Sequence, residues 1–235
     1  MLFPWLLNNS VAHSRWVRVD RLRTRVKICG IVDPDDAHIA VEGGADALGF
    51  VFHEPSVRYV APERAAAIIR ELPAFIDTVG VVVDLGRQEL DNIARVSGID
   101  YFQFHGEEDP QLCAAAGLPY LKALRIGADT DVRAGAERYA GAKGLLLDAF
   151  ADDLAGGTGN TFDWSRIPAY LPVPVFLAGG LDSGNVAEAI GLVHPFGVDV
   201  SSGVESTPGV KDPARIIEFL RTVADADYQL RQARL

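Results

Sequence analysis

The sequence predicts a single α/β domain in which eight strand–helix units close into a (β/α)8 barrel. Short apolar runs alternate with amphipathic, Ala-rich segments about every 25 residues, which is typical of repeated βα units around a parallel sheet. The length of 235 residues suits one such barrel. A doubly wound open sheet usually has fewer strands and a Gly-rich turn after the first one, whereas the Gly-rich turns of this chain come late.

The strands are expected in continuous apolar runs, because parallel strands are covered on both faces. We place them at 26–28, 47–52, 78–83, 101–104, 121–124, 144–147, 175–177 and 197–200. Helices are expected between them, among others at 34–42, 62–71, 88–96 and 213–223. Two of these helices begin with an Asp-Pro pair, Asp33-Pro34 and Asp212-Pro213, which suits an N-cap residue followed by the first helical position.

The barrel is expected to span residues 25–224. Residues 1–24 are predicted to be an N-terminal extension that could be disordered, because they are Arg-rich and lack clear periodicity. Their apolar start, residues 1–7, is too short to span a bilayer and lacks a secretory cleavage site, so we expect no membrane targeting. Residues 225–235 are predicted to be a charged helical tail that is solvated rather than functional.

The composition narrows the classes of partner. A formal net charge of -10 argues against a nucleic-acid partner, because proteins that bind the phosphate backbone display clustered Lys and Arg. The two cysteines, Cys29 and Cys113, form no CxxC pair and no spacing typical of a zinc site or a disulfide framework. A reducing cytoplasm is therefore the expected location. The acidic surface favours a monomer, with a dimer as the alternative.

Functional residues of such a barrel lie at the carboxyl ends of the strands. Cys29 ends the first strand beside Gly30, where a partly formed thiolate could take a proton from carbon. The alternative is a small buried apolar residue, which is how most free cysteines behave. Cys113 lies in a helical run and is expected in the core.

Asp148 ends the apolar sixth strand. A carboxylate is costly to bury there unless it is paired or protonated, and a protonated carboxyl group could donate a proton. The alternative for Asp148 is a capping or loop residue. Asp84 follows the third strand in the same manner, and placement alone does not choose between the two.

Glycine-rich turns follow the last three strands, at 156–159, 178–181 and 201–203. Glycines after strands seven and eight allow backbone N–H groups to converge on an anion, so three such turns predict a phosphorylated ligand. The alternative is tight turn geometry without a ligand. Arg58 follows the second strand and could fork onto a carboxylate, or it could be a solvated loop charge. His105 follows the fourth strand and could hydrogen-bond at the barrel mouth, although a lone histidine is more often structural.

Nine short motifs occur in a fixed order along the chain. They are KICG at 27–30, ADALGFVF at 45–52, RYV at 58–60, QFHG at 103–106, LD at 147–148, GGTG at 156–159, FDW at 162–164, AGGL at 178–181 and GVDVSSGVE at 197–205. Together they resemble the phosphoribosylanthranilate isomerases over about residues 26–220, and the combination is far more specific than any one piece.

The resemblance implies an Amadori rearrangement of N-(5-phosphoribosyl)anthranilate to 1-(o-carboxyphenylamino)-1-deoxyribulose 5-phosphate in tryptophan biosynthesis, without a metal or an organic cofactor. It selects Asp148 over Asp84 as the general acid and makes Cys29 the general base. It further assigns Arg58 to the anthranilate carboxylate. The phosphate would be surrounded by Gly157, Gly159, Gly180, Ser202 and Gly203.

The chain departs from the family pattern at three positions. Val57 stands in place of a frequent Pro, Phe104 in place of a frequent Leu, and Asn160 in place of a frequent Lys. The change at Asn160 removes a positive charge near the expected phosphate site, which puts the affinity in question rather than the reaction class.

Rival functions are other phosphate-binding barrel enzymes and a barrel that binds sugar phosphates without turnover. An epimerase would need His and Asp metal ligands at several strand ends, whereas only His53 and His105 fall near such ends. A histidine-pathway isomerase would be expected to have a carboxylate in place of Cys29. A binding protein that had lost turnover would be expected to lack Cys29 or Asp148, and this chain keeps both.

Overall fold

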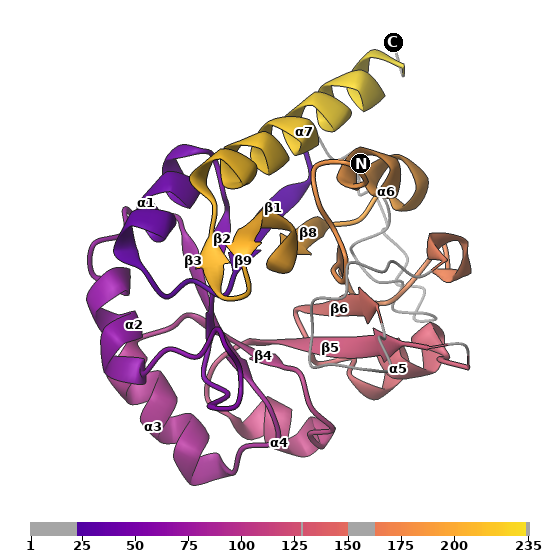
Figure 1. Ribbon diagram of the computed structural model, residues 1–235. Coiled ribbons are helices and arrows are strands. Elements are labelled where there is room, and N and C mark those ends of the chain that lie inside the picture. The colour runs from indigo at the N-terminus through magenta and orange to yellow at the C-terminus, as the bar shows by residue number, and fades with distance from the viewer. Residues whose placement is uncertain (1–22, 128, 150–162, 234–235) are drawn as a thin grey trace, which may run out of the picture.

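The computed structural model describes residues 23–127, 129–149 and 163–233, and their centre is a closed barrel of parallel strands (Figure 1). Each strand pairs with the next in the chain, and β8 pairs with β1. The expected (β/α)8 fold is therefore confirmed. The strands are β1 (Arg25–Cys29), β2 (Ala47–Val51), β3 (Asp77–Val82), β4 (Tyr101–Phe104), β5 (Tyr120–Ile126), β6 (Gly144–Ala149), β7 (Val175–Leu177) and β8 (Gly197–Val200).

Helices cover the outside of the barrel (Figure 1). They are α1 (Pro34–Glu42), α2 (Pro62–Ile69), α3 (Arg87–Ser97), α4 (Pro110–Ala115), α5 (Val132–Arg138), α6 (Val186–Val193) and α7 (Pro213–Gln232). In the described part of the β6–β7 connection, a 3-10 helix, η1 (Trp164–Arg166), is the one helical element. A second 3-10 helix, η2 (Ser202–Val204), and a hairpin of β9 (Glu205–Thr207) and β10 (Val210–Lys211) separate β8 from α7.

The two predicted Asp-Pro helix starts are confirmed. The Asp33 carboxylate accepts a hydrogen bond from the Asp35 N–H at 2.9 Å. The Asp212 carboxylate accepts from the N–H groups of Ala214 and Arg215 at 2.9 and 3.2 Å. Each cap satisfies donors that have no partner within the helix, which stabilises the fold by about 1 kcal/mol. These caps fix where α1 and α7 begin after the loops that carry the site.

The strands divide their side chains between two cores. Alternate residues such as Ile28, Phe50 and Phe102 face the helices in one large apolar cluster, since successive side chains of a strand point to opposite faces. The other face of each strand fills the barrel with smaller apolar groups, one of them formed by Cys29, Val51 and Val81 and another by Ala123, Leu146 and Ala178. Cys113 is fully buried in the outer cluster, as expected.

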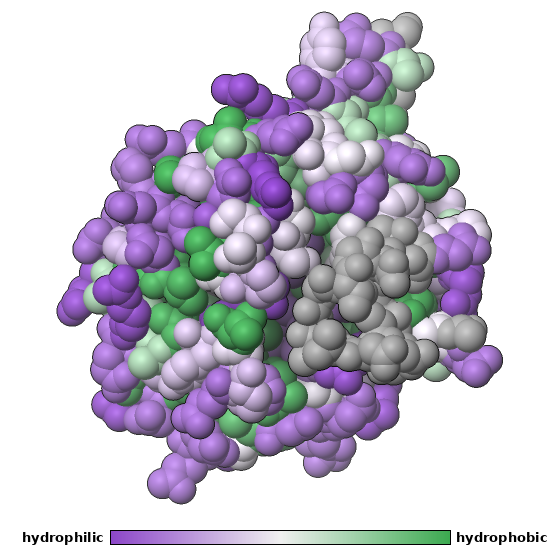
Figure 2. Space-filling view, viewed as in Figure 1, coloured by the Kyte–Doolittle hydropathy of each residue, from purple (hydrophilic) through white to green (hydrophobic). Residues whose placement is uncertain are grey.

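Hydrophilic side chains cover much of the face shown in Figure 2, and apolar residues gather toward its centre. Within the described ranges, no helix is both long enough and apolar enough to cross a membrane. Buried Leu, Ile and Phe side chains stabilise the fold by about 1.5–3 kcal/mol each, so the two cores supply the main driving force for folding.

Helix α7 crosses the boundary expected at residue 225 without a break and ends at Gln232. It packs against α1 and α6 (Figure 1). The inner face of this last part of α7 is not solvated, because Ala226 and Asp227 are buried. The Asp227 carboxylate accepts from the Thr24 N–H at 2.5 Å and from the Thr24 hydroxyl at 2.8 Å. This contact joins the segment before β1 to the last helix.

We expect Asp227→Ala to lower the free energy of unfolding by about 1–3 kcal/mol, because two buried donors of Thr24 would lose their acceptor. Urea unfolding followed by circular dichroism measures the change. Asp225→Ala is the matched control, since Asp225 lies on the exposed face of the same helix. Equal effects of the two substitutions would contradict a stabilising role of the buried contact between Thr24 and Asp227.

Candidate active site

The candidate site lies at the carboxyl ends of the strands. Cys29 is the last residue of β1 and is 7 % exposed. The chain turns directly after it at Gly30, which has a φ of +79°, a conformation that favours glycine. The N–H groups of Gly30 and Ile31 both donate to the carbonyl of Gly49 at 2.9 Å. The turn therefore holds the thiol at the mouth, against the neighbouring strand β2.

Opposing effects act on the Cys29 thiol. Burial raises its pKa above the ordinary value, and the nearby Asp199 carboxylate raises it further. The ammonium groups of Lys27 and Lys211 lower the pKa, and Lys27 also hydrogen-bonds to the thiol. Burial is the largest of these effects and leaves the pKa raised, so the neutral thiol is the main form near neutral pH.

A buried ion pair lies beside the thiol inside the barrel. The Lys27 Nζ is 2.7 Å from Asp199 Oδ1, and both side chains are less than a tenth exposed. Burial would lower the pKa of Lys27, but the attraction of Asp199 and Cys29 outweighs it and the pKa is raised. Lys27 is therefore an ammonium group. It also donates to Gln103 Oε1 at 2.9 Å.

Asp148 lies near the end of β6, where His105 of the β4–α4 loop contacts it. His105 Nε2 is 3.0 Å from Asp148 Oδ2, and the two side chains are 22 % and 23 % exposed. The other ring nitrogen, Nδ1, lies 3.1 Å from Gln103 Nε2. Asp148 is thus both partnered within the protein and open to the mouth, as a group that exchanges a proton with a ligand must be.

Asp84, the competing carboxylate, has a different environment. Its backbone φ is +51°, and its Oδ1 accepts from the Glu107 N–H at 2.7 Å. A Cβ at Gly106 would lie 2.3 Å from Asp84 Oδ1, so this position has no room for a side chain. Asp84 therefore shapes the loop that follows β4.

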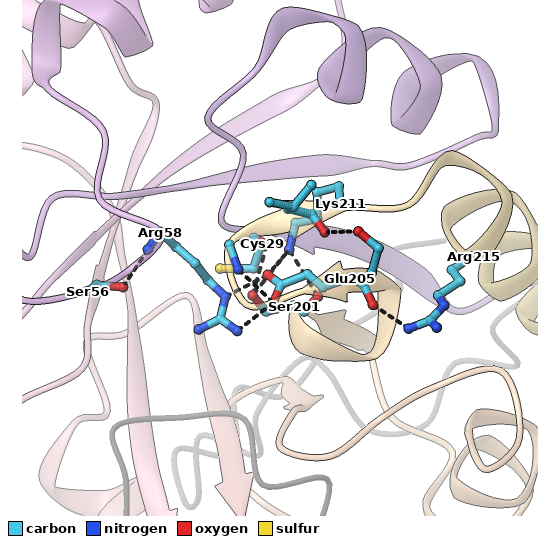
Figure 3. Close-up of polar contacts among 10 residues, drawn as sticks. Cys29, Ser56, Arg58, Ser201, Glu205, Lys211 and Arg215 are labelled. Carbon is cyan, nitrogen blue, oxygen red and sulfur yellow. Dashed lines mark hydrogen bonds and ion pairs between the residues drawn. The ribbon is translucent and has the colours of Figure 1, made fainter.

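Arg58, in the loop after β2, contacts Glu205, which follows β8 (Figure 3). Its Nε and Nη2 donate to the two carboxylate oxygens of Glu205, each at 2.7 Å. Lys211 donates to Glu205 Oε1 at 2.9 Å and to the Ser201 carbonyl at 3.0 Å. Burial would raise the pKa of Glu205, but these cations hold it below the ordinary value. Burial lowers the pKa of Lys211 despite the attraction of Glu205.

The β9–β10 hairpin carries Glu205 and Lys211 to this position. Gly209 in its turn has a φ of +84°, and a Cβ there would lie 2.7 Å from the carbonyl oxygen of Val57. The hairpin therefore packs directly on the loop that contains Arg58. The Ser201 hydroxyl also donates to the Cys29 carbonyl at 3.1 Å, so the β8 turn is joined to the β1 turn as well (Figure 3).

The turns after β7 and β8 form a compact unit. Gly179 and Gly180 have φ values of +75° and +66°, and a Cβ at Gly203 would lie 1.9 Å from the Leu181 carbonyl oxygen. Gly180, Ser202 and Gly203 are thus brought together. Within the described ranges, the N–H groups of these three residues donate to no protein acceptor, and those of Ser202 and Gly203 begin the helix η2.

The first glycine turn, including Gly157, Gly159 and the nearby Asn160, lies outside the described residues. As for metals, no group of three His, Cys, Asp or Glu side chains in the described part of the chain is arranged to hold an ion.

Several residues of the site carry no role in the sequence analysis. Lys27, Gln103, Asp199 and Glu205 stand inside the quoted motifs, and Lys211 stands outside them. A signal was available for two of them, because a lysine in the apolar run VKI and an aspartate in the run VDV each need a buried partner. The partnership of Arg58 with Glu205 has no comparable signal, since it depends on where the hairpin folds.

Comparison with known proteins decides the family. The sequence model described as N-(5'-phosphoribosyl)anthranilate (PRA) isomerase matches residues 26–222. The chain belongs to this family. The isomerase of Pseudomonas putida strain F1 is 50 % identical over 202 residues, which cover 86 % of this chain and 98 % of that one. The isomerase of Thiobacillus denitrificans is 50 % identical over 199 residues, covering 85 % and 97 %.

Solved structures of the family share the fold of this isomerase. The phosphoribosyl anthranilate isomerase of Thermotoga maritima is 40 % identical with a TM-score of 0.80, and the match covers 86 % of this chain and 99 % of that one. A second structure, in complex with reduced 1-(o-carboxyphenylamino)-1-deoxyribulose 5-phosphate, is 37 % identical with a TM-score of 0.74 and the same coverage. The expected family and its enzymatic nature are confirmed.

Gly49 makes room for the thiol, which yields a test. A Cβ at this position would lie 2.7 Å from Cys29 Sγ and 2.9 Å from Lys27 Cε. We expect Gly49→Ala to destabilise the fold by about 1–3 kcal/mol, because a crowded interior must shift both side chains. Thermal unfolding measures the loss.

Gly191→Ala is the matched control, since a Cβ there meets nothing within 4 Å in helix α6. It should be neutral or stabilising by up to about 1 kcal/mol. In a Cys29→Ala background, Gly49→Ala should cost less than in the wild type. An equal cost in both backgrounds would show that the thiol is not the crowded group.

Proposed function

We propose that this isomerase converts N-(5-phosphoribosyl)anthranilate to 1-(o-carboxyphenylamino)-1-deoxyribulose 5-phosphate, with Cys29 as general base and Asp148 as general acid. The observation that carries the proposal is the position of the two groups. Cys29 ends β1 and Asp148 lies near the end of β6, on separate sides of one barrel mouth. A sugar held between them meets an acid on one side and a base on the other.

Asp148 begins the reaction. It protonates the furanose ring oxygen as the C1′–O4′ bond breaks, and the nitrogen lone pair forms the C=N bond of a Schiff base. The carboxylate that remains is stabilised by the neighbouring His105. The small exposure of Asp148 allows contact with the sugar while the partner keeps its side chain in one orientation.

Cys29 completes the proton transfers. Its thiolate takes the proton from C2′, and the electrons of that C–H bond move toward the Schiff base to give an enolamine, which tautomerises to the ketone. The ammonium groups of Lys27 and Lys211 favour the thiolate against the cost of its burial. Proton transfers and one ring opening make up the whole sequence, so a metal or an organic cofactor has no step to perform.

The two anionic ends of the substrate are assigned to separate groups. Arg58 would bind the anthranilate carboxylate through Nη1, while the pair with Glu205 holds its Nε and Nη2 in place. The N–H groups of Gly180, Ser202 and Gly203, which have no acceptor among the described residues, would bind the phosphate. The phosphorylated ligand named for a 37 % identical relative supports the binding of a phosphorylated molecule by this fold. Gly157 and Gly159 remain expected phosphate contacts.

The setting of the enzyme follows from its chemistry and charge. We expect it in a reducing cytoplasm, where the thiols of Cys29 and Cys113 stay free. The acidic surface favours a monomer, although one relative is described as dimeric. Sedimentation velocity measures the state.

We expect the purified chain to consume phosphoribosylanthranilate at a rate that a chelator does not change. Cys29→Ala and Asp148→Ala should each lower kcat by about 10²–10⁴-fold, because each removes one proton-transfer group. Loss of substrate fluorescence measures turnover. Cys113→Ala is the control for removal of a thiol, since Cys113 lies in the outer core. A wild-type chain that binds the reduced product analogue without turnover would instead be a non-catalytic sugar-phosphate-binding barrel.

The rate should also depend on pH through Cys29. Because burial raises the pKa of the thiol, kcat/KM should rise with pH as the thiolate forms. Lys211→Met removes a cation that favours the thiolate, so the rise should move to higher pH. Lys143 is exposed and precedes β6, at the opposite end of the strand from the site. Lys143→Met should therefore leave the pH profile unchanged. A shift to lower pH in Lys211→Met would contradict the role of Cys29 as base.

A further inference from the structure

We infer that the hydrogen-bond chain Lys27–Gln103–His105–Asp148 holds His105 as the neutral tautomer protonated at Nε2. Asp148 Oδ1 is then the oxygen that carries the transferable proton. Gln103 becomes a positioning residue that acts through His105. The catalytic meaning of this chain rests on the proposed role of Asp148, whereas the tautomer itself does not.

Lys27 sets the donor-to-acceptor direction of the hydrogen-bond chain. An ammonium group has hydrogen-bond donors and no acceptor. Lys27 Nζ donates to Asp199 Oδ1 at 2.7 Å and to Gln103 Oε1 at 2.9 Å. The Gln103 amide must therefore turn its oxygen to Lys27 and its NH2 group to the opposite side.

The amide nitrogen of Gln103 in turn decides which ring nitrogen of His105 carries the proton. Gln103 Nε2 can only donate, and it lies 3.1 Å from His105 Nδ1, so Nδ1 must accept and carries no proton. A neutral imidazole then bears its proton on Nε2. That nitrogen lies 3.0 Å from Asp148 Oδ2, which accepts the bond.

The members of the chain have little freedom to choose another arrangement. Gln103 is 1 % exposed, and Lys27 is held by its ion pair with Asp199. The backbone of His105 is fixed as well, because its N–H donates to the Val82 carbonyl at 2.9 Å.

Buried charged side chains hold the loop after His105 in place. Glu108 accepts from the Gly106 N–H at 3.0 Å, and Lys122 donates to the Gly106 carbonyl at 2.6 Å. Glu108 and Lys122 form a buried ion pair of 3.0 Å with each other. The charged groups of Glu108, Lys122 and Asp84 bond to backbone groups of the loop, so among the described residues Asp148 is the charged group in contact with the ring.

The tautomer assists the acid step. A hydrogen bond to an ionised oxygen is about twice as strong as one between neutral groups. The bond from His105 to Oδ2 therefore strengthens as Asp148 gives its proton from Oδ1 to the ring oxygen. The amide of Gln103 keeps both its protons, so the chain orients the acid and does not conduct protons between Asp148 and Cys29.

The test is the protonation of His105 in the ligand-free protein. Two-bond 1H–15N spectra of the chain labelled with 15N-histidine distinguish the two neutral tautomers and the imidazolium. The signal of His105 is the one that disappears in His105→Asn. We expect protonated Nε2 and unprotonated Nδ1 in the wild type, and the opposite tautomer or the imidazolium would overturn the inference.

Gln103→Glu reverses the direction at the middle of the chain. Glutamate presents two acceptor oxygens, so Nδ1 of His105 should gain a proton, and kcat should fall about ten- to hundredfold with a smaller change in KM. Gln88→Glu adds the same charge on the exposed face of α3 and should change neither the tautomer of His105 nor kcat. An unprotonated Nδ1 in folded Gln103→Glu would overturn the inference.

Two further measurements keep the outcome interpretable. If Gln103→Glu loses its near-ultraviolet circular dichroism, Gln103→Met takes its place. The Asp148 carboxylate still favours a proton on Nε2 in this variant, but Nδ1 has lost its donor, so the imidazolium should appear beside the Nε2 tautomer. Histidine spectra of Gln103→Met that match those of the wild type would overturn the role of Gln103. A wild-type chain without turnover would refute the proposed function, while the spectra would still decide the tautomer.

Discussion

The buried ion pair of Lys27 and Asp199 is the interaction on which the site depends. It joins β1 to β8, where the barrel closes, and its ammonium group also reaches Cys29 and Gln103. Two unpaired charges in this interior would each cost several kcal/mol, so the pair must form for the barrel to close. The thiol and the chain to Asp148 both take their orientation from it.

A second polar cluster, made of Arg58, Glu205 and Lys211, lies next to Cys29 at the same end of the barrel. Its members come from the β2–α2 loop and from the β9–β10 hairpin, and Glu205 receives three charge-assisted bonds from the two cations. An arginine that is already oriented loses less freedom when it binds a carboxylate. In the proposed function, this cluster would allow a chain with a net charge of -10 to bind an anion at one place.

Much of this structure could be predicted from the sequence. Continuous apolar runs located all eight strands to within two residues at either end, and the Asp-Pro pairs located the starts of α1 and α7. Cys29, Asp148 and Arg58 stood out because they follow strands. The pairing of Lys27 with Asp199 and of Arg58 with Glu205 could not be predicted, since each joins residues far apart in the chain. Such contacts depend on how the barrel closes and on how the β9–β10 hairpin folds, and a local sequence pattern predicts neither.

The pairing of β1 with β8 has a consequence for synthesis. Cys29 receives a hydrogen bond on its carbonyl from Ser201, and Lys27 meets Asp199, each across 172 residues. A growing chain still attached to the ribosome holds Cys29, its proposed general base, long before Asp199, Ser201 and Lys211 have been made. The surroundings of the thiol therefore cannot be complete until β8 and the hairpin that follows it have been synthesised.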